Sequence, residues 1–147
     1  MKLLHSFLGG LAGAVTLTAT HQLLQKFVTN APRMDLLGEE VLEKITDRFD
    51  VSIDDDNRYN ITFAGDVLGN TLYYALAGIG SSKHACTRGG LLGLAAGIGG
   101  VILPKYLGLN NRHSNKTVET KLLTVGLYTL GGAVAGSIIK CLGKKRV

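Results

Sequence analysis

Four long stretches rich in glycine, alanine and leucine dominate this chain of 147 residues. They cover approximately residues 3–28, 61–82, 89–109 and 122–142. Each is close to the roughly 20 residues of helix that cross a bilayer core of about 30 Å. Glycine reaches 20 residues while tryptophan is absent, and small residues let helices approach closely in lipid. The pattern predicts an all-α integral membrane protein, a four-helix bundle in a single domain covering residues 1–147.

Two other interpretations of these stretches exist. One is a soluble bundle of buried, glycine-rich helices, which the lengths of the stretches disfavour. The other is that the first stretch is a signal peptide, because Lys2 precedes an apolar run. The apolar pattern continues past Thr20 without a clear cleavage site of small residues. We therefore expect a retained span.

The connection between the first two stretches is the longest, and it carries most of the negative charge. Nine of the 11 acidic residues lie between Asp35 and Asp56. Within this connection, large apolar residues recur at helical spacing: Met34, Leu37, Val41, Ile45 and Phe49. Charged residues occupy the other faces, as they do in amphipathic helices at membrane surfaces. The pattern predicts an interfacial amphipathic helix over residues 34–49, lying on the membrane or covering the bundle.

Polar residues inside the first two stretches gather at the ends that meet this long connection. His21 and Gln25 share one face of the first stretch, and Asp66, Asn70 and Tyr73 share one face of the second. At a rise of about 1.5 Å per residue, His21, Asp66 and Asn70 lie at a similar depth, on the order of 7–13 Å below the surface. We expect these side chains to form one polar region.

Asp66 is the residue of this region that is most costly to place in a bilayer. Insertion scales assign about 2.5–3.5 kcal/mol to an Asp at the centre of a span, so Asp66 should face the bundle or water and have a partner. The candidates are His21, Lys105 at the end of the third stretch and Lys121 at the start of the fourth. One interpretation is a polar pocket or relay open toward the long connection. The alternative is a hydrated Asp66 near the surface and a His21 that only packs and hydrogen-bonds.

Glycines recur four residues apart in three of the stretches. The rows are Gly9 and Gly13, then Gly89, Gly93 and Gly97, then Gly132 and Gly136. Rows of this kind form close helix contacts in membranes, and we predict a packing role for them. A phosphate-binding loop is disfavoured, because none of these glycines follows a strand and leads into a helix.

The rest of the sequence holds no motif that indicates catalysis, metal binding or cofactor binding. The chain shows no convergent set of catalytic groups and no metal-type spacing of cysteine and histidine. We therefore predict no catalytic residue, no metal, no cofactor and no nucleic-acid partner. Four spans would place both termini on one side of the membrane. The basic tail and the compact connection holding Lys83 and Arg88 favour cytoplasmic termini.

The block Ala-Pro-Arg-Met-Asp at residues 31–35, with His21 before it and Asp66 after it, resembles a group of small uncharacterised bacterial membrane proteins. The resemblance implies an inner-membrane location and no particular activity. It also draws attention to Arg33 and Asp35, which can pair with each other or anchor the predicted interfacial helix to the polar region. The alternative for both is a solvated ion pair and a helix cap.

Three functions are compatible with these patterns. The scarcity of catalytic groups favours a non-enzymatic subunit of a membrane assembly, whose partners are the bilayer and other membrane chains or copies of itself. The second is a small channel or transporter with a proton or cation relay through Asp66 and His21. The third is a lipid-modifying membrane enzyme, with His21, Asp66 and Arg33 around a headgroup.

Overall fold

The structure is a computed structural model that describes residues 2–144. Helices account for most of that range: α1 (Lys2–Phe27), α2 (Met34–Arg48), α3 (Asp55–Ala75), α4 (Ala85–Tyr106), α5 (Arg112–Asn115) and α6 (Val118–Lys144). Short 3-10 turns at Leu76–Gly78 and Ser82–His84 join α3 to α4. No strand occurs between residues 2 and 144. The prediction of an all-α fold is confirmed for this part of the chain.

Three helical segments are long and apolar enough to cross a membrane. They are Lys2–Phe27, Ser82–Tyr106 and Val118–Lys144. Helix α3 is not among them, because it carries Asp55, Asp56 and Arg58 in its first turn and Asp66 near its middle. The chain therefore has three helices suited to a bilayer, which supports a membrane protein, and the fourth predicted span is the one that differs.

Helix α3 also differs from the predicted range 61–82 at both ends. It begins at Asp55, where acidic residues in the first turn interact favourably with the positive end of the helix dipole. It ends at Ala75, and Gly80 then adopts a φ of +88°, a left-handed conformation that side chains other than glycine rarely take. The polar connection before α3 is correspondingly shorter than the sequence pattern indicates.

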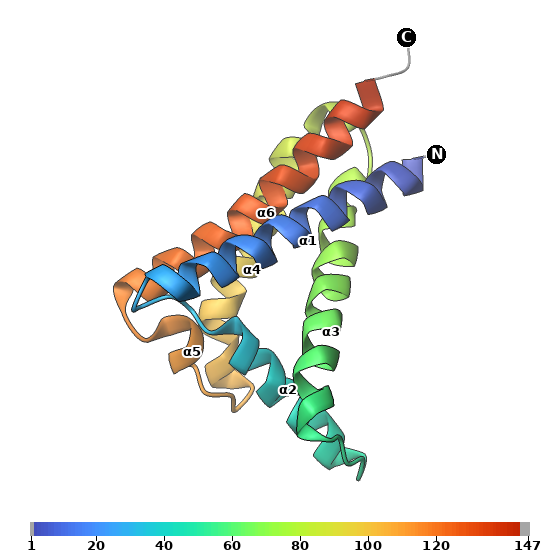
Figure 1. The fold of residues 1–147 in the computed structure, drawn as a ribbon. Coiled ribbons are helices and arrows are strands. Elements are labelled where there is room, and N and C mark those ends of the chain that lie inside the picture. The colour runs from blue at the N-terminus through green and yellow to red at the C-terminus, as the bar shows by residue number, and fades with distance from the viewer. Residues whose placement is uncertain (1, 145–147) are drawn as a thin grey trace.

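Helix α6 packs against both α1 and α4, and these contacts form the tightly packed part of the molecule (Figure 1). Glycines lie where the backbones meet. Gly89 of α4 faces the Gly132 carbonyl of α6, and Gly13 of α1 faces the Gly131 carbonyl. A side chain at either position would collide with the facing backbone. An apolar cluster of Leu17 from α1, Tyr74 from α3, and Leu127 and Ala135 from α6 fills the space between these three helices.

Helix α3 touches this group at one end and diverges from it at the other (Figure 1). Near the contact, Gly10 of α1 lies against the Thr71 carbonyl, and the Tyr73 hydroxyl donates a 2.9 Å hydrogen bond to the Leu92 carbonyl of α4. Beyond that point α3 and α4 separate. Helix α2 crosses the open end, with Gly38 lying against Thr62 of α3.

The other end of α2 is fastened to the connection that follows α4. Lys44 donates a 2.8 Å hydrogen bond to the Gly108 carbonyl, and Glu40 accepts a 2.9 Å bond from the Asn110 amide. Within the helix, Leu37 is buried while Ile45 is exposed. The helix Met34–Arg48 falls within the predicted range 34–49; its place at a membrane surface stays a prediction.

Candidate functional site

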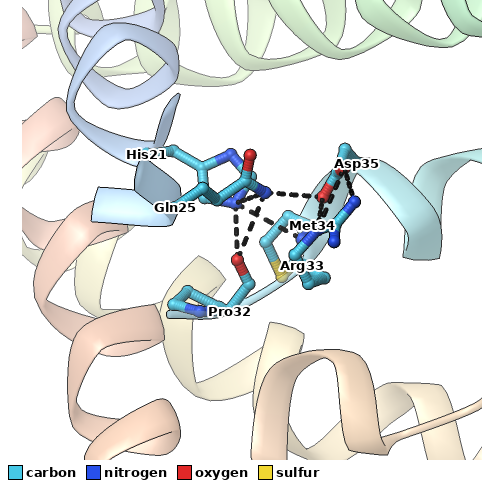
Figure 2. Close-up of polar contacts among 6 residues, drawn as sticks. All are labelled: His21, Gln25, Pro32, Arg33, Met34 and Asp35. Atoms are coloured by element: carbon cyan, nitrogen blue, oxygen red, sulfur yellow. Dashed lines mark hydrogen bonds and ion pairs between the residues drawn. The ribbon is translucent and has the colours of Figure 1, made fainter. Parts of the chain in front are cut away.

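The polar region is built where the chain turns back from α1 into α2 (Figure 2). Pro32, which cannot continue a helix by donating a backbone hydrogen bond, is fully buried. Arg33, in a non-helical conformation, precedes the first residue of α2. This turn brings the backbone of Pro32 and the side chain of Asp35 beside His21 and Gln25, which stand one turn apart on α1.

His21 is buried and holds this turn through one ring nitrogen. Its Nε2 lies 2.8 Å from the Pro32 carbonyl oxygen, which can only accept, so Nε2 carries the proton. The Gln25 amide nitrogen and the Met34 backbone nitrogen lie 3.1 Å and 3.4 Å from the same Nε2. A protonated Nε2 cannot accept a hydrogen bond from either of these donors, and the shorter contact with the Pro32 carbonyl decides its role. The bond to Pro32 therefore places the proton of the neutral His21 ring on Nε2, the nitrogen that faces the α1–α2 turn.

Gln25 and Arg33 converge on the Asp35 carboxylate. The Gln25 amide donates a 2.7 Å hydrogen bond to Oδ1. The Arg33 guanidinium forms a two-pronged ion pair, with Nε 3.0 Å from Oδ1 and Nη2 2.7 Å from Oδ2. Partial burial acts to raise the pKa of Asp35, but the bonds from Arg33 and Gln25 outweigh it and hold that pKa below its ordinary value. The same pairing raises the pKa of Arg33.

Asp66 stands on α3 and borders two hollows, besides a small space of about 10 Å³ against α1 and α6. Its nearest polar partner is on its own helix, because the Asn70 amide donates a 2.9 Å hydrogen bond to Oδ1. No ion pair reaches Asp66 among residues 2–144. One hollow lies between α1 and α3, and the other lies between α3 and α4. The carboxylate is therefore available to a group from outside the chain.

The first hollow, here called the α1–α3 cavity, has a volume of about 50 Å³. His21, Asp35 and Asp66 line it, together with the hydroxyl-bearing residues Thr18 and Thr62. The hydroxyl oxygens of Thr18 and Thr62 are buried without a hydrogen-bond partner in the described part of the chain. The cavity therefore combines unpaired hydroxyls with two carboxylates, of which Asp35 is paired with Arg33 and Asp66 forms no ion pair within residues 2–144.

The second hollow, here called the α3–α4 cleft, has a volume of about 500 Å³. One wall is polar and consists of Asp66, Asn70 and Tyr73 on α3. The opposite wall on α4 is made of small and aliphatic residues, namely Ala95, Ala96, Gly99, Gly100 and Leu103. Helix α2 closes one end of the cleft through Met34, Leu37, Gly38 and Val41. The result is a mainly apolar groove with a single polar face.

The structure brings together most of the residues expected in the polar region, and leaves two outside. His21, Gln25 and Asp66 line the α1–α3 cavity, and Asn70 and Tyr73 line the α3–α4 cleft. Lys105 and Lys121 are exposed and line neither hollow. On α6, Thr120 and Thr124 take the buried face, which turns Lys121 outward. Of the three partners expected for Asp66, only His21 shares a hollow with it.

Three lining residues escaped the sequence analysis: Tyr59, Thr62 and Phe63. All three precede Asp66 on α3 at spacings of three, four and seven, which place them on its face of the helix. Tyr59 lies outside the predicted second stretch, which begins at residue 61, whereas Thr62 and Phe63 lie inside it and their spacing from Asp66 already placed them on its face. The acidic first turn of α3 would have extended the helix and revealed this face.

Comparisons with protein-family models, with curated proteins and with solved structures find no match to this chain. Within residues 2–144, no three His, Cys, Asp or Glu side chains are grouped so that they could hold a metal ion. What the site does must therefore be argued from its geometry.

Proposed function

We propose that this chain is a multi-pass membrane protein that acts as a non-enzymatic subunit of a membrane assembly, and that the α3–α4 cleft receives a helix of its partner. The observation that carries the proposal is the position of Asp66 and Asn70 on the wall of an open cleft that is otherwise apolar. Both the chemistry and the shape of that cleft suit another helix.

The chemistry concerns the cost of a carboxylate in lipid. Helix α3 is too polar to face lipid along its whole length, and an ionised group inside a bilayer is stable only when it faces protein or water. A partner helix in the cleft would cover Asp66 and supply a hydrogen-bond donor to it. The resulting bond would remove the penalty that the isolated chain bears.

The shape concerns how closely a partner can approach. Ala95, Ala96, Gly99 and Gly100 present almost no side-chain bulk on the α4 wall, and small residues permit close backbone contacts between helices in lipid. The opposite face of α4 already uses Gly89 and Gly93 in this way against α6. The cleft offers a similar row of small residues on α4, open between α3 and α4 except where α2 closes one end.

A permeation path through a single copy is less well supported. On the side of the termini, the polar region meets the packed apolar cluster of Leu17, Tyr74, Leu127 and Ala135. Tyr74 is fully buried there, and its hydroxyl is bonded to the Tyr128 carbonyl at 2.9 Å. A pathway would have to pass through this cluster, whereas a docking site requires only the open cleft.

The proposal is tested by filling the cleft. A side chain at Gly99 would enter the cleft, while one at Gly90, on the same helix, would meet no atom of the chain within 4 Å. After gentle extraction from native membranes, we expect the wild type and Gly90→Leu to retain another chain in a fixed ratio. We expect Gly99→Leu to lose it. A monomeric wild type, or an equal effect of both substitutions, would contradict the proposal.

A proton or cation relay through Asp66 and His21 is the second candidate, and one observation favours it. The unpaired hydroxyls of Thr18 and Thr62 face the α1–α3 cavity beside Asp66, and about 50 Å³ is room enough for a water molecule with several polar partners. If this relay operates, Asp66→Asn abolishes ion-dependent flux in liposomes without unfolding the protein. Unchanged flux in that variant rejects the relay.

The location follows from the same proposal. We place the protein in a bacterial inner membrane with both termini in the cytoplasm, on the support of the 31–35 block and the basic tail. This orientation requires α3 to return the chain between α1 and α4, which its course in Figure 1 permits. Cys141 is exposed near the end of α6 and offers a test. In a Cys86→Ser background, a membrane-impermeant thiol reagent should label Cys141 only after the cells are opened. Labelling of Cys141 in intact spheroplasts would reverse the orientation.

A further inference from the structure

A third hollow lies between the α1–α2 connection and the α5 segment. These segments lie at the end of the molecule opposite the two chain termini (Figure 1). It has a volume of about 630 Å³, and we call it the α5 cavity. Four basic residues line it: Arg33, Arg112, His113 and Lys116. No carboxylate is among the described residues that line it. The α5 cavity is therefore a cationic hollow, in contrast to the apolar α3–α4 cleft.

Its walls are joined by hydrogen bonds between segments far apart in the sequence. The Arg33 amide donates a 2.7 Å bond to the His113 carbonyl. The Thr120 hydroxyl donates a 2.9 Å bond to the Asn30 carbonyl, and the Thr124 hydroxyl a 3.0 Å bond to the Ser114 carbonyl. These bonds fix the α1–α2 connection against α5 and the start of α6. The basic residues are therefore carried by backbone whose position is set before any ligand arrives.

Three carboxylates are hydrogen-bonded to residues that line this cavity: Asp35, Glu119 and Glu40, which accepts a 2.9 Å bond from the Asn110 amide. Asp35 is held by Arg33 and Gln25, and Glu119 accepts a 2.8 Å hydrogen bond from the Asn30 amide. Arg112 and Lys116 form no ion pair within residues 2–144. Two positive charges thus border the hollow without an anionic partner in the described part of the chain.

We propose that the α5 cavity binds a phosphate group, carried either by an anionic lipid headgroup or by a small soluble phosphate. Guanidinium and ammonium groups are the side chains that bind phosphate oxygens through charge-assisted hydrogen bonds. The cavity lies where α1 ends and α6 begins, which is the headgroup level if these helices span the bilayer. This site is separate from the α3–α4 cleft, and the proposal does not depend on the docking of a partner.

The decisive variant removes the two unpaired charges, Arg112→Gln together with Lys116→Gln. Both side chains are exposed and neither makes a side-chain hydrogen bond within residues 2–144, so the fold should persist. The matched control is Lys83→Gln together with Lys144→Gln, which removes the same net charge from exposed positions at the opposite end. A charge-preserving exchange, Arg112→Lys with Lys116→Arg, guards against a purely structural effect.

Two probes distinguish the sources of phosphate. In the first, the full chain is reconstituted into nanodiscs of phosphatidylcholine with or without phosphatidylglycerol, and retained lipid is counted by native mass spectrometry. In the second, inorganic phosphate is titrated against detergent-solubilised protein while the unfolding midpoint is followed. Preferential retention of phosphatidylglycerol identifies a headgroup, and stabilisation by inorganic phosphate identifies a soluble ligand.

In whichever assay responds, the wild type, the control pair and the charge-preserving exchange should bind alike. The Arg112→Gln and Lys116→Gln pair should bind at least roughly tenfold more weakly, because a hydrogen bond to a charged group contributes about the free energy of a tenfold change. A response in neither assay overturns the proposal. An equal loss in the control pair also overturns it, because the attraction would then come from net charge and not from this cavity.

Discussion

Gln25, near the end of α1, donates a 2.7 Å hydrogen bond to the carboxylate of Asp35, in the first turn of α2. The bond links two helices across a connection of six residues, and Arg33 holds the same carboxylate from the other side. Because α2 closes one end of the α3–α4 cleft, this contact helps to determine the shape of the surface that we assign to a partner.

Substitution of Asp35 by Asn should loosen α2 from α1. The change removes the charge that pairs with Arg33 and weakens the bond from Gln25, and we expect a loss of about 1–2 kcal/mol in the free energy of unfolding, since hydrogen bonds to charged groups are among the stronger ones. Hydrogen exchange of the peptide that covers α2 should accelerate. Asp47→Asn, an exposed position on the same helix, is the control and should leave the exchange unchanged.

The same contact should be sensitive to acid. The folded-state pKa of Asp35 lies below its ordinary value of about 3.9. Its contribution to stability is therefore fully present above that value and is lost as the pH falls through the lower folded-state pKa. The unfolding midpoint in detergent should fall more steeply for the wild type than for Asp35→Asn between about pH 5 and pH 2. Parallel curves for the two proteins would show that Asp35 is not the group responsible.

Much of the fold could be predicted from hydrophobic patterning, and the part that could not is α3. Helices α1, α4 and α6 are apolar enough to cross a membrane, so span length alone identifies them. Helix α3 mixes apolar residues with Asp55, Arg58 and Asp66. Its range depends on dipole and turn chemistry at its ends, and its tilt away from α4 depends on tertiary contacts with α1 and α2. Periodicity carries no information on that tilt.

In the candidate site, too, some features could be predicted from the sequence and others could not. The spacing of His21 and Gln25, and of Asp66 and Asn70, correctly places each pair on one helical face, because helix geometry is regular. The bond from His21 to the Pro32 carbonyl could not be predicted, since it depends on how the chain turns after α1. Lys105 and Lys121 lie on the expected helices but face outward, and only the packing of α4 and α6 determines that rotation.

His21 should stabilise the fold through the hydrogen bond that its Nε2–H donates to the Pro32 carbonyl. Replacement by Leu removes the close donor of the buried Pro32 carbonyl, which keeps only the longer 3.5 Å bond from Gln25, and should cost about 1–3 kcal/mol. Gln retains a donor and should restore part of the loss. Thermal unfolding in detergent measures both effects. Nitrogen-15 NMR of the imidazole provides a separate check, because protonation at Nε2 is required by the 2.8 Å contact. A neutral ring that carries its proton on Nδ1 alone would refute this assignment.

The close approach of α4 and α6 should make glycine irreplaceable at their contact and replaceable elsewhere on the same helix. A Cβ at Gly132 would collide with the Gly89 carbonyl, whereas one at Gly126 would meet no atom of the chain within 4 Å. We expect Gly132→Ala to destabilise the protein by about 1–3 kcal/mol, the usual range for overpacking. Gly126→Ala should be neutral or stabilising by up to about 1 kcal/mol, because Ala favours a helix over Gly.

Steric trapping or controlled unfolding in mixed micelles would measure the free energy of unfolding for both variants. The matched pair separates two explanations of the glycine rows. If Gly132→Ala and Gly126→Ala have the same effect, glycine acts at these positions through helix propensity alone. If only Gly132→Ala destabilises the protein, the backbone contact with Gly89 is what the row maintains, and the three apolar helices are held together by contacts that work in lipid, where the hydrophobic effect contributes little.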